Sequence, residues 1–182
     1  MSENNKNNRQ PDFLNIDLQR REELRRRIDR AQDYDEIFQL VKRVVEDELG
    51  VHRAGLTLVL SNMPGTVGAF HPVGANVIVV NKSLVDGMRK VVKNPKELNA
   101  FVFMILMHEY LHSLGYLDEG EVRKIAQNIC RHALGEDHPT VKLANANWME
   151  MYPELRSLAQ QPFSRNFEVV QKFDSSSTSY IG

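Results

Sequence analysis

The chain has 182 residues, of which 42% are apolar, and a formal net charge of −1. That length and apolar content fit one globular domain with a sizeable core. A net charge near zero gives no compositional argument for a nucleic-acid or membrane partner. The longest fully apolar run, residues 100–107, is far shorter than the ~20 residues that span a bilayer.

The N-terminus and the cysteine content bear on the compartment. Residues 1–12 are polar and rich in asparagine, and they lack the apolar segment of a secretory signal peptide. We expect them to form a disordered tail. The single cysteine, Cys130, excludes an internal disulfide bond and fits a reducing compartment. We therefore predict a cytoplasmic protein.

Two helices are predicted at the start of the folded part. Residues 17–31 form a charged helix with a thin apolar stripe and six arginines. Its interleaved carboxylates favour a solvated face with i,i+4 ion pairs, and the alternative is a contact with an RNA backbone or an acidic partner. Residues 35–49 keep apolar side chains at helical spacing, and Gly50 ends that helix.

Two strands follow, at residues 54–61 and 75–81, because both segments are rich in β-branched and apolar residues. The loop between them, residues 61–74, is rich in glycine and proline. A loop of this length between strands is often functional. For its histidine, His71, we favour an ordinary loop position, with stabilisation of an oxyanion in a cleft as the alternative.

A short helix is predicted at 83–92 and a longer one at 95–114. Asn94 is placed as the N-cap of the longer helix and Pro95 as its first residue. From residue 100 to residue 107 this helix is apolar on every side, so we expect it to be buried at the centre of the fold.

A further helix is predicted at 119–134, with a clean apolar face that includes Cys130. Cys130 is therefore predicted to be a core residue rather than a reactive thiol or a metal ligand. His52 and His138 flank helix ends and are predicted to lie at the surface.

The end of the buried helix carries the chemistry, in the segment "HEYLH" at 108–112. Residues i and i+4 lie on one face of a helix, so His108 and His112 can bind one metal ion together. Glu109 lies beside them and can hold a water molecule as a general base. This is the HExxH arrangement of a zinc hydrolase.

A catalytic zinc ion needs a third protein ligand, and the sequence leaves its identity open. We rank Asp118 first, because Gly115 allows the chain to leave the helix and return towards the metal. The competing role for Asp118 is the N-cap of the next helix, with Glu121 in the capping box.

Glu119 ranks second as the third ligand. Helical spacing places it beside the apolar face of its helix, where a carboxylate requires a partner. Glu121 ranks third, and His132 on the flank of the same helix is a weaker candidate.

The strand "ANVIVVN" and the helix with "HEYLH" resemble those of the zincin metallopeptidases. "HEYLHSLGYLD" is similar to the metzincin pattern HExxHxxGxx(H/D), which Asp118 would complete. "MEMYP" at 149–153 resembles the methionine turn of that group, with Met151 as the candidate. The helix at 119–134 instead resembles gluzincins, in which a glutamate on the helix after HExxH is the third ligand. The bacterial zinc-dependent rRNA-processing endoribonucleases, with HxxxHxxGxDH, are also similar, but they lack the glutamate that Glu109 supplies.

The resemblance implies an α+β fold: a small zincin-like domain at 13–162, with a short sheet packed on the active-site helix and additional N- and C-terminal helices. An extended tail follows at 163–182. The resemblance also implies a Zn2+ cofactor held by His108, His112 and Asp118. Glu109 would act as the general base in the hydrolysis of peptide or protein substrates.

Two further expectations concern access to this site. An extended substrate is expected to pair with the exposed edge of the 75–81 strand. A separate hypothesis is that the C-terminal tail, with "FEVVQKF" at 167–173 as a strand-like piece, blocks the cleft. The alternative functions are an endoribonuclease-like zinc hydrolase and a non-catalytic binding protein on a large assembly such as the ribosome.

Overall fold

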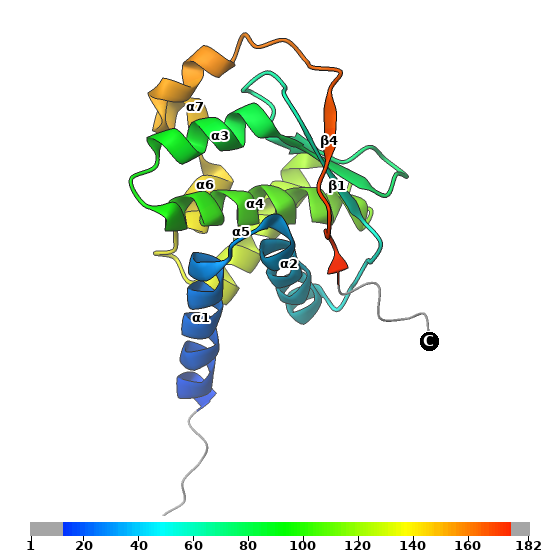
Figure 1. Cartoon of the computed structure of the whole chain (residues 1–182). Coiled ribbons are helices and arrows are strands. Elements are labelled where there is room, and N and C mark those ends of the chain that lie inside the picture. Colours follow the sequence, from blue (N-terminus) through cyan, green and yellow to red (C-terminus); the bar gives the residue numbers. More distant parts are fainter. Residues whose placement is uncertain (1–12, 176–182) are drawn as a thin grey trace, which may run out of the picture.

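The computed structural model describes residues 13–175, so the predicted tail at 1–12 and residues 176–182 lie outside this range. One small sheet lies beside a group of helices, and the predicted α+β class is confirmed (Figure 1). Within residues 13–175, no helix combines the length and the apolar character needed to cross a lipid bilayer. In chain order the elements are α1 (Phe13–Arg30), α2 (Tyr34–Leu49), β1 (Thr57–Ser61), β2 (Ala69–Phe70), β3 (Val77–Asn81), α3 (Lys82–Val91), α4 (Pro95–Ser113), α5 (Glu119–Leu134), α6 (Pro139–Asn145), α7 (Trp148–Met151), the 3-10 helix η1 (Pro153–Leu158) and β4 (Phe167–Val169).

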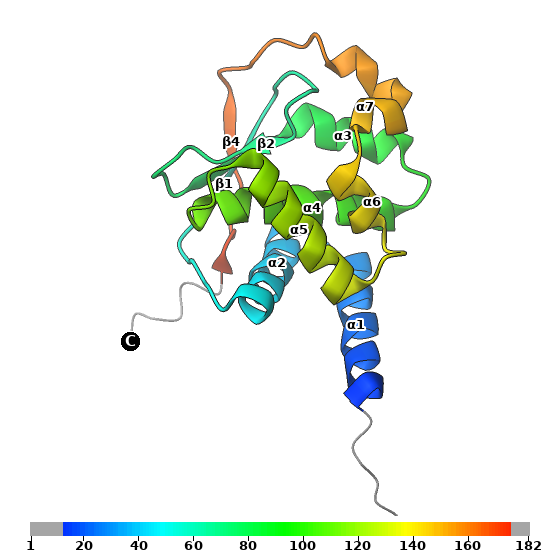
Figure 2. The same ribbon diagram turned by 180° about the vertical axis from the view of Figure 1, so that it is seen from behind.

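Helix α4 lies at the centre of the fold. It packs against five other helices and against strands β2 and β3, and Figures 1 and 2 show it crossing the middle of the molecule. All side chains from Ala100 to Met107 are buried, which explains why this segment is apolar on every side. The Asn94 side chain caps the first turn by accepting a hydrogen bond from the Lys96 N–H at 3.0 Å. The HExxH segment therefore lies at the end of a rigidly packed helix.

The sheet has four strands in the order β2-β3-β1-β4. Strands β1 and β3 are parallel, and β2 and β4 pair antiparallel at the two edges. The prediction of an exposed edge at 75–81 is therefore wrong, because β3 lies between β2 and β1. Strand β2 has only two residues, too few for sequence periodicity to reveal it. The open edge on this side of the sheet belongs to β2.

Helix α1 projects from the body of the molecule at its N-terminal end (Figures 1 and 2). Near its other end Ile28 is fully buried, whereas Leu18 is 55% exposed. Two of its arginines bind the C-terminal end of α5: Arg25 Nε donates to the Leu134 carbonyl at 2.7 Å, and Arg21 Nη2 donates to the His132 carbonyl at 3.1 Å. Cations at this position complement the helix dipole. Part of the arginine content of α1 therefore has a structural role.

The described part of the C-terminal tail is bound to the body. Strand β4 pairs with β1, Phe173 stacks on Phe38 with ring centroids 4.4 Å apart, and Asp174 forms a buried ion pair with Lys42. Strand β4 lies at the opposite edge of the sheet from β2. The expectation that "FEVVQKF" blocks the cleft is therefore wrong, because this segment completes the far edge of the sheet.

Candidate metal centre

Three side chains from two helices converge at the end of α4: His108 and His112 from α4, and Glu119 from the first turn of α5. Their ligand atoms all lie within 4.8 Å of one another. The two Nε2 atoms are 3.2 Å apart. Each Nε2 atom is also 3.2 Å from one carboxylate oxygen of Glu119, Oε2 for His108 and Oε1 for His112. We call this group the His–His–Glu cluster.

The spacing of the cluster fits a zinc ion. Two ligand atoms at about 2.0–2.1 Å from a tetrahedral zinc ion lie about 3.3 Å apart, close to the 3.2 Å between the two Nε2 atoms. Each Nε2 atom also lies 3.2 Å from a different oxygen of Glu119, so one carboxylate group faces both imidazoles. The donor set of two imidazoles and one carboxylate is also that of a catalytic zinc site, in which the fourth position binds water or substrate.

The hydrogen bond of His112 fixes the orientation of its imidazole in the cluster. Its Nδ1 lies 2.8 Å from the carbonyl oxygen of Tyr116, and this contact requires a proton on Nδ1. A neutral His112 then presents a lone pair at Nε2, which faces both the Glu119 carboxylate and His108 Nε2. Either a proton or a metal ion can lie between these atoms, and a metal-ligating histidine commonly has this backbone hydrogen bond.

The local chain path explains how Tyr116 comes to orient His112. The Gly115 backbone has φ +103°, a conformation that other residues rarely adopt. Its N–H donates to the His112 carbonyl at 3.0 Å, and the Tyr116 N–H returns to the Leu111 carbonyl at 3.3 Å. The turn brings the Tyr116 carbonyl back to the imidazole and starts α5 beside the end of α4.

Asp118, ranked first as the third ligand, lies outside the cluster. Its side chain caps α5 by accepting a hydrogen bond from the Glu121 N–H at 2.8 Å, which is the alternative role predicted for it. The structure instead brings Glu119 to the histidines, so the ranking of these two carboxylates is corrected. The physical reason is that the N-cap carboxylate turns back to the first backbone N–H groups of α5, whereas the next side chain faces α4.

Glu109, the predicted general base, follows His108 on α4. Its side chain is buried and lines the same cavity as His108 and Glu119. Burial, together with the negative charge of Glu119, raises the pKa of Glu109 to about 8, and a hydrogen bond from the His71 backbone N–H opposes that rise. Burial also lowers the pKa of His108 below its ordinary value. Neutral imidazole is the form that binds a metal.

A cavity of about 590 Å³ opens beside the cluster. This volume lies in the range of small-ligand sites. Its wall is formed by residues 65–69, by the α4 residues Met104 and Ile105, by the segment 143–149, and by Arg123 on α5. The sequence interpretation missed Arg123 and Trp148 in this wall. The i,i+4 spacing of Arg123 from Glu119 is the signal that could have found it.

The wall owes its shape to the glycine-rich loop. A Cβ atom at Gly68 would lie 2.6 Å from the Trp148 ring, and one at Gly65 would lie 2.7 Å from the Leu158 side chain. The Gly65 N–H also donates to the Leu158 carbonyl at 2.7 Å. The glycines in this loop therefore allow α7 and η1 to pack directly on its backbone.

Most other predicted candidates lie away from the cluster. His132 is exposed and contacts Glu48 at 2.6 Å. Met151, proposed for the methionine turn, is 41% exposed at the end of α7, and Met149 lines the cavity instead. His138, predicted at the surface, is buried and caps α6. That prediction is wrong because sequence position alone does not reveal a buried cap.

The remaining candidates are His71, Glu121 and Cys130. The His71 imidazole donates from Nδ1 to the Val77 carbonyl at 2.9 Å, and the residue is not part of the cavity wall. Its backbone, rather than its imidazole, contacts the site through Glu109. Glu121 is exposed and outside the cluster. Cys130 is fully buried, which confirms its predicted place in the core.

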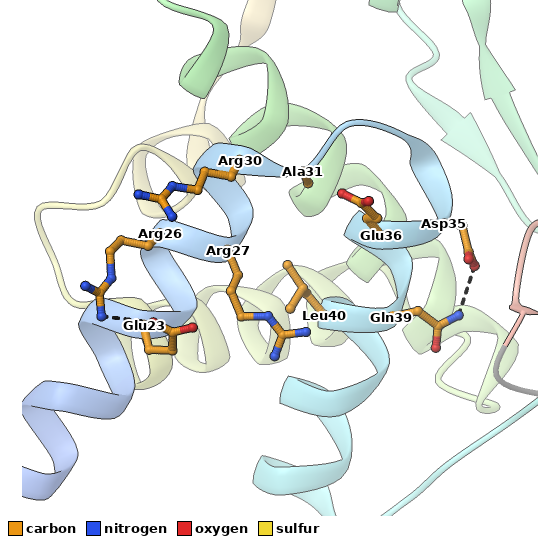
Figure 3. Close-up of a pocket in the computed structure, with 9 residues that line it drawn as sticks. All are labelled: Glu23, Arg26, Arg27, Arg30, Ala31, Asp35, Glu36, Gln39 and Leu40. Atoms are coloured by element: carbon orange, nitrogen blue, oxygen red, sulfur yellow. Dashed lines mark hydrogen bonds and ion pairs between the residues drawn. The ribbon is translucent and has the colours of Figure 1, made fainter.

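A second cavity, of about 490 Å³, lies between α1 and α2 (Figure 3). Three arginines and three carboxylates line it, so its charge is balanced. The carboxylates already have partners: Glu23 binds Arg26, Asp35 binds the Gln39 side chain, and Glu36 accepts from the Gln32 N–H. This cavity shares no residue with the His–His–Glu cluster.

In a comparison with known proteins, no protein-family model, curated protein or solved structure matches this chain. The interpretation of the centre therefore depends on the geometry of its own residues.

Proposed function

We propose that this chain is a zinc-dependent peptidase with its catalytic centre at the end of α4. The observation that carries the proposal is the convergence of His108, His112 and Glu119 within 4.8 Å, with Glu109 in the wall of the adjoining cavity. A zinc ion that served structure alone would not need this additional carboxylate.

His108, His112 and Glu119 would hold the zinc ion. When bound, zinc acts as a Lewis acid and lowers the pKa of a water ligand to about 7. The charge of a divalent cation at the cluster favours the ionised form of Glu109, against the effect of burial. Glu109 then accepts the proton of the attacking water and donates it to the leaving amine of the substrate.

The edge of strand β2 offers a place for the substrate backbone. The Asn81 N–H donates to the Gly68 carbonyl at 2.9 Å, and Ala69 lies opposite Val80. In an antiparallel ladder of this register, Ala69 directs its own N–H and C=O away from β3. Ala69 lines the cavity together with Glu109, so an extended peptide that pairs with Ala69 would lie beside the base.

The endoribonuclease-like alternative loses support from the position of Asp118. In that family the third ligand occupies this position, whereas here the Asp118 side chain caps α5. The alternative of a non-catalytic binding protein does not explain why Glu109 is buried beside the cluster. The single cysteine suits a reducing compartment, and we propose the cytoplasm as the location.

The test is hydrolysis of a mixture of unstructured peptides by the zinc-loaded full-length protein and by Glu109→Gln. Loss of a general base lowers the rate by about 10²- to 10⁴-fold, while the zinc content stays unchanged. Glu121→Gln is the matched control, because Glu121 is exposed and outside the cluster. Equal hydrolysis by wild type and Glu109→Gln would reject the assigned base. Cleavage of RNA but not of peptides would select the endoribonuclease-like alternative.

A further inference from the structure

Arg123 is the one cationic side chain in the wall of the cavity beside the cluster, among the residues that the structure describes. The other charged groups in that wall are Glu109 and Glu119, which the proposed function uses as base and ligand. Arg123 lies one turn after Glu119 on α5, so both side chains lie on the same face of the helix.

The guanidinium of Arg123 has N–H donors available for a ligand. Its contact with Glu119 joins Nε to Oε2 at 3.8 Å, which is too long for a hydrogen bond. Within residues 13–175 it makes no hydrogen bond to another side chain or to the backbone. The side chain is 70% exposed, and an arginine offers five N–H donors in a planar fork that matches a carboxylate.

Apart from Glu119, at 3.8 Å, no carboxylate of the described wall lies at ion-pair distance from Arg123. Glu119 shares its charge with any metal that the cluster binds, and Glu109 is buried on the α4 side of the cavity. The other wall residues are glycines, apolar side chains, Thr66, and the amides Asn145 and Asn147. Of the groups that a peptide substrate can bring to this wall, a carboxylate is the best match for the Arg123 guanidinium.

We propose that Arg123 is a specificity-determining residue that binds a carboxylate of the peptide substrate near the reacting bond. This inference rests on the proposed function and narrows its substrate class to peptides that present a carboxylate at the cavity. An aspartate or glutamate side chain and a free C-terminus offer the same chemistry. A planar carboxylate receives two N–H donors from the guanidinium fork.

The test uses three zinc-directed probes, because a thiolate is a strong zinc ligand. Mercaptoacetyl-Leu-Asn amide is neutral. Mercaptoacetyl-Leu-Asp amide adds a side-chain carboxylate, and mercaptoacetyl-Leu-Asn with a free C-terminus adds a terminal one. Their affinities for the zinc-loaded full-length protein are measured by calorimetry, together with the zinc content of each variant.

We expect at least one carboxylate probe to bind wild type about tenfold more tightly than the neutral probe, as a charge-assisted hydrogen bond at an exposed site provides. The probe that gains affinity identifies the source of the carboxylate. In Arg123→Gln the ratio of the affinities for the carboxylate probe and the neutral probe falls to about one, while zinc is retained. Lys124→Gln, which removes an exposed cation outside the cavity wall, keeps the wild-type ratio.

Several outcomes would overturn the inference. A ratio near one in wild type, or a wild-type ratio in Arg123→Gln, shows that Arg123 does not bind the carboxylate. Weaker zinc binding by Arg123→Gln, with the wild-type affinity ratio kept when the variant is saturated with zinc, shows that Arg123 only positions Glu119. If wild type hydrolyses peptides and yet treats the probes alike, this inference fails and the proposed function stands. If wild type binds neither zinc nor any thiol, both fail.

Discussion

The buried ion pair between Lys42 and Asp174 allows a quantitative test of how the C-terminal segment is anchored. The two side chains are 4% and 1% exposed, and Asp174 Oδ2 also accepts a hydrogen bond from the Leu56 N–H at 3.0 Å. The perturbation is Asp174→Asn in the full-length protein. Asparagine matches aspartate in size, retains an oxygen for the Leu56 N–H, and tolerates the positive φ of +57° at this position.

The substitution therefore removes mainly the negative charge opposite Lys42. Removal of one partner from a buried ion pair costs about 3–5 kcal/mol, a large share of the roughly 5–15 kcal/mol by which domains are stable. We expect the free energy of unfolding to fall by about that amount. The same anchor implies that deletion of residues 164–182 destabilises the protein and does not unblock the site.

The assay is urea unfolding at a fixed zinc concentration, because a bound ligand adds to the measured stability. Asp47→Asn is the control, since Asp47 is exposed on the helix that carries Lys42. Lys42→Met combined with Asp174→Asn should lose less than the sum of the two single changes, because the partners are coupled. Equal stabilities of Asp174→Asn and Asp47→Asn, or additive losses in the double variant, would show that the Lys42–Asp174 pair does not stabilise the fold.

Two further predictions concern His138 and Gly68. Burial and the nearby Arg25 lower the pKa of His138 from 6.5 to about 4. As pH falls, the unfolded chain therefore binds a proton at this histidine before the folded chain does. The free energy of unfolding should then fall between about pH 6.5 and pH 4, by up to about 3 kcal/mol. Urea unfolding at a series of pH values should show this fall in wild type and not in His138→Asn, which retains a capping residue. Parallel curves of unfolding free energy against pH for the two proteins would argue against a buried neutral imidazole. Gly68→Ala places a Cβ atom 2.6 Å from the ring of Trp148, so we expect a loss of about 1–3 kcal/mol and a red shift in the emission of this single tryptophan. Gly74→Ala, strained by a φ of +80° but with nothing within 4 Å, should lose stability without that shift, and a shift common to both variants would contradict the assigned contact.

The helices could be predicted from the sequence because their signals are local. The predicted bounds of α5 are those of the structure, and α4 differs by one residue at its end. Continuous apolar composition and an N-cap before a proline are sufficient to place α4. His108, Glu109 and His112 could be found for the same reason, since an i,i+4 pair on one helix needs no tertiary information.

The sheet edges and the third member of the cluster depend on contacts that local patterns do not encode. Strand β2 forms only because Ala69 and Phe70 lie against β3. Asp118 and Glu119 are adjacent carboxylates, and which of them faces α4 depends on how α5 packs against that helix. The expectation that burial against an apolar face gives Glu119 a partner is not confirmed, because its side chain is 64% exposed; its contacts with the histidines follow from the place of α5 beside the end of α4.

In the proposed zinc site, Glu119 and not Asp118 is the third ligand beside His108 and His112. The most direct measurement is the zinc affinity of the full-length protein, by competition with a chelator, for wild type, Glu119→Gln and Asp118→Asn. Each variant removes one charge from one of two adjacent residues, and asparagine still caps a helix. We predict one zinc ion per chain in wild type and in Asp118→Asn, and for Glu119→Gln a loss at least as large as the roughly 10- to 100-fold that outer-shell changes cause. Zinc lost from Asp118→Asn and retained by Glu119→Gln, or no zinc bound to wild type, would contradict the account.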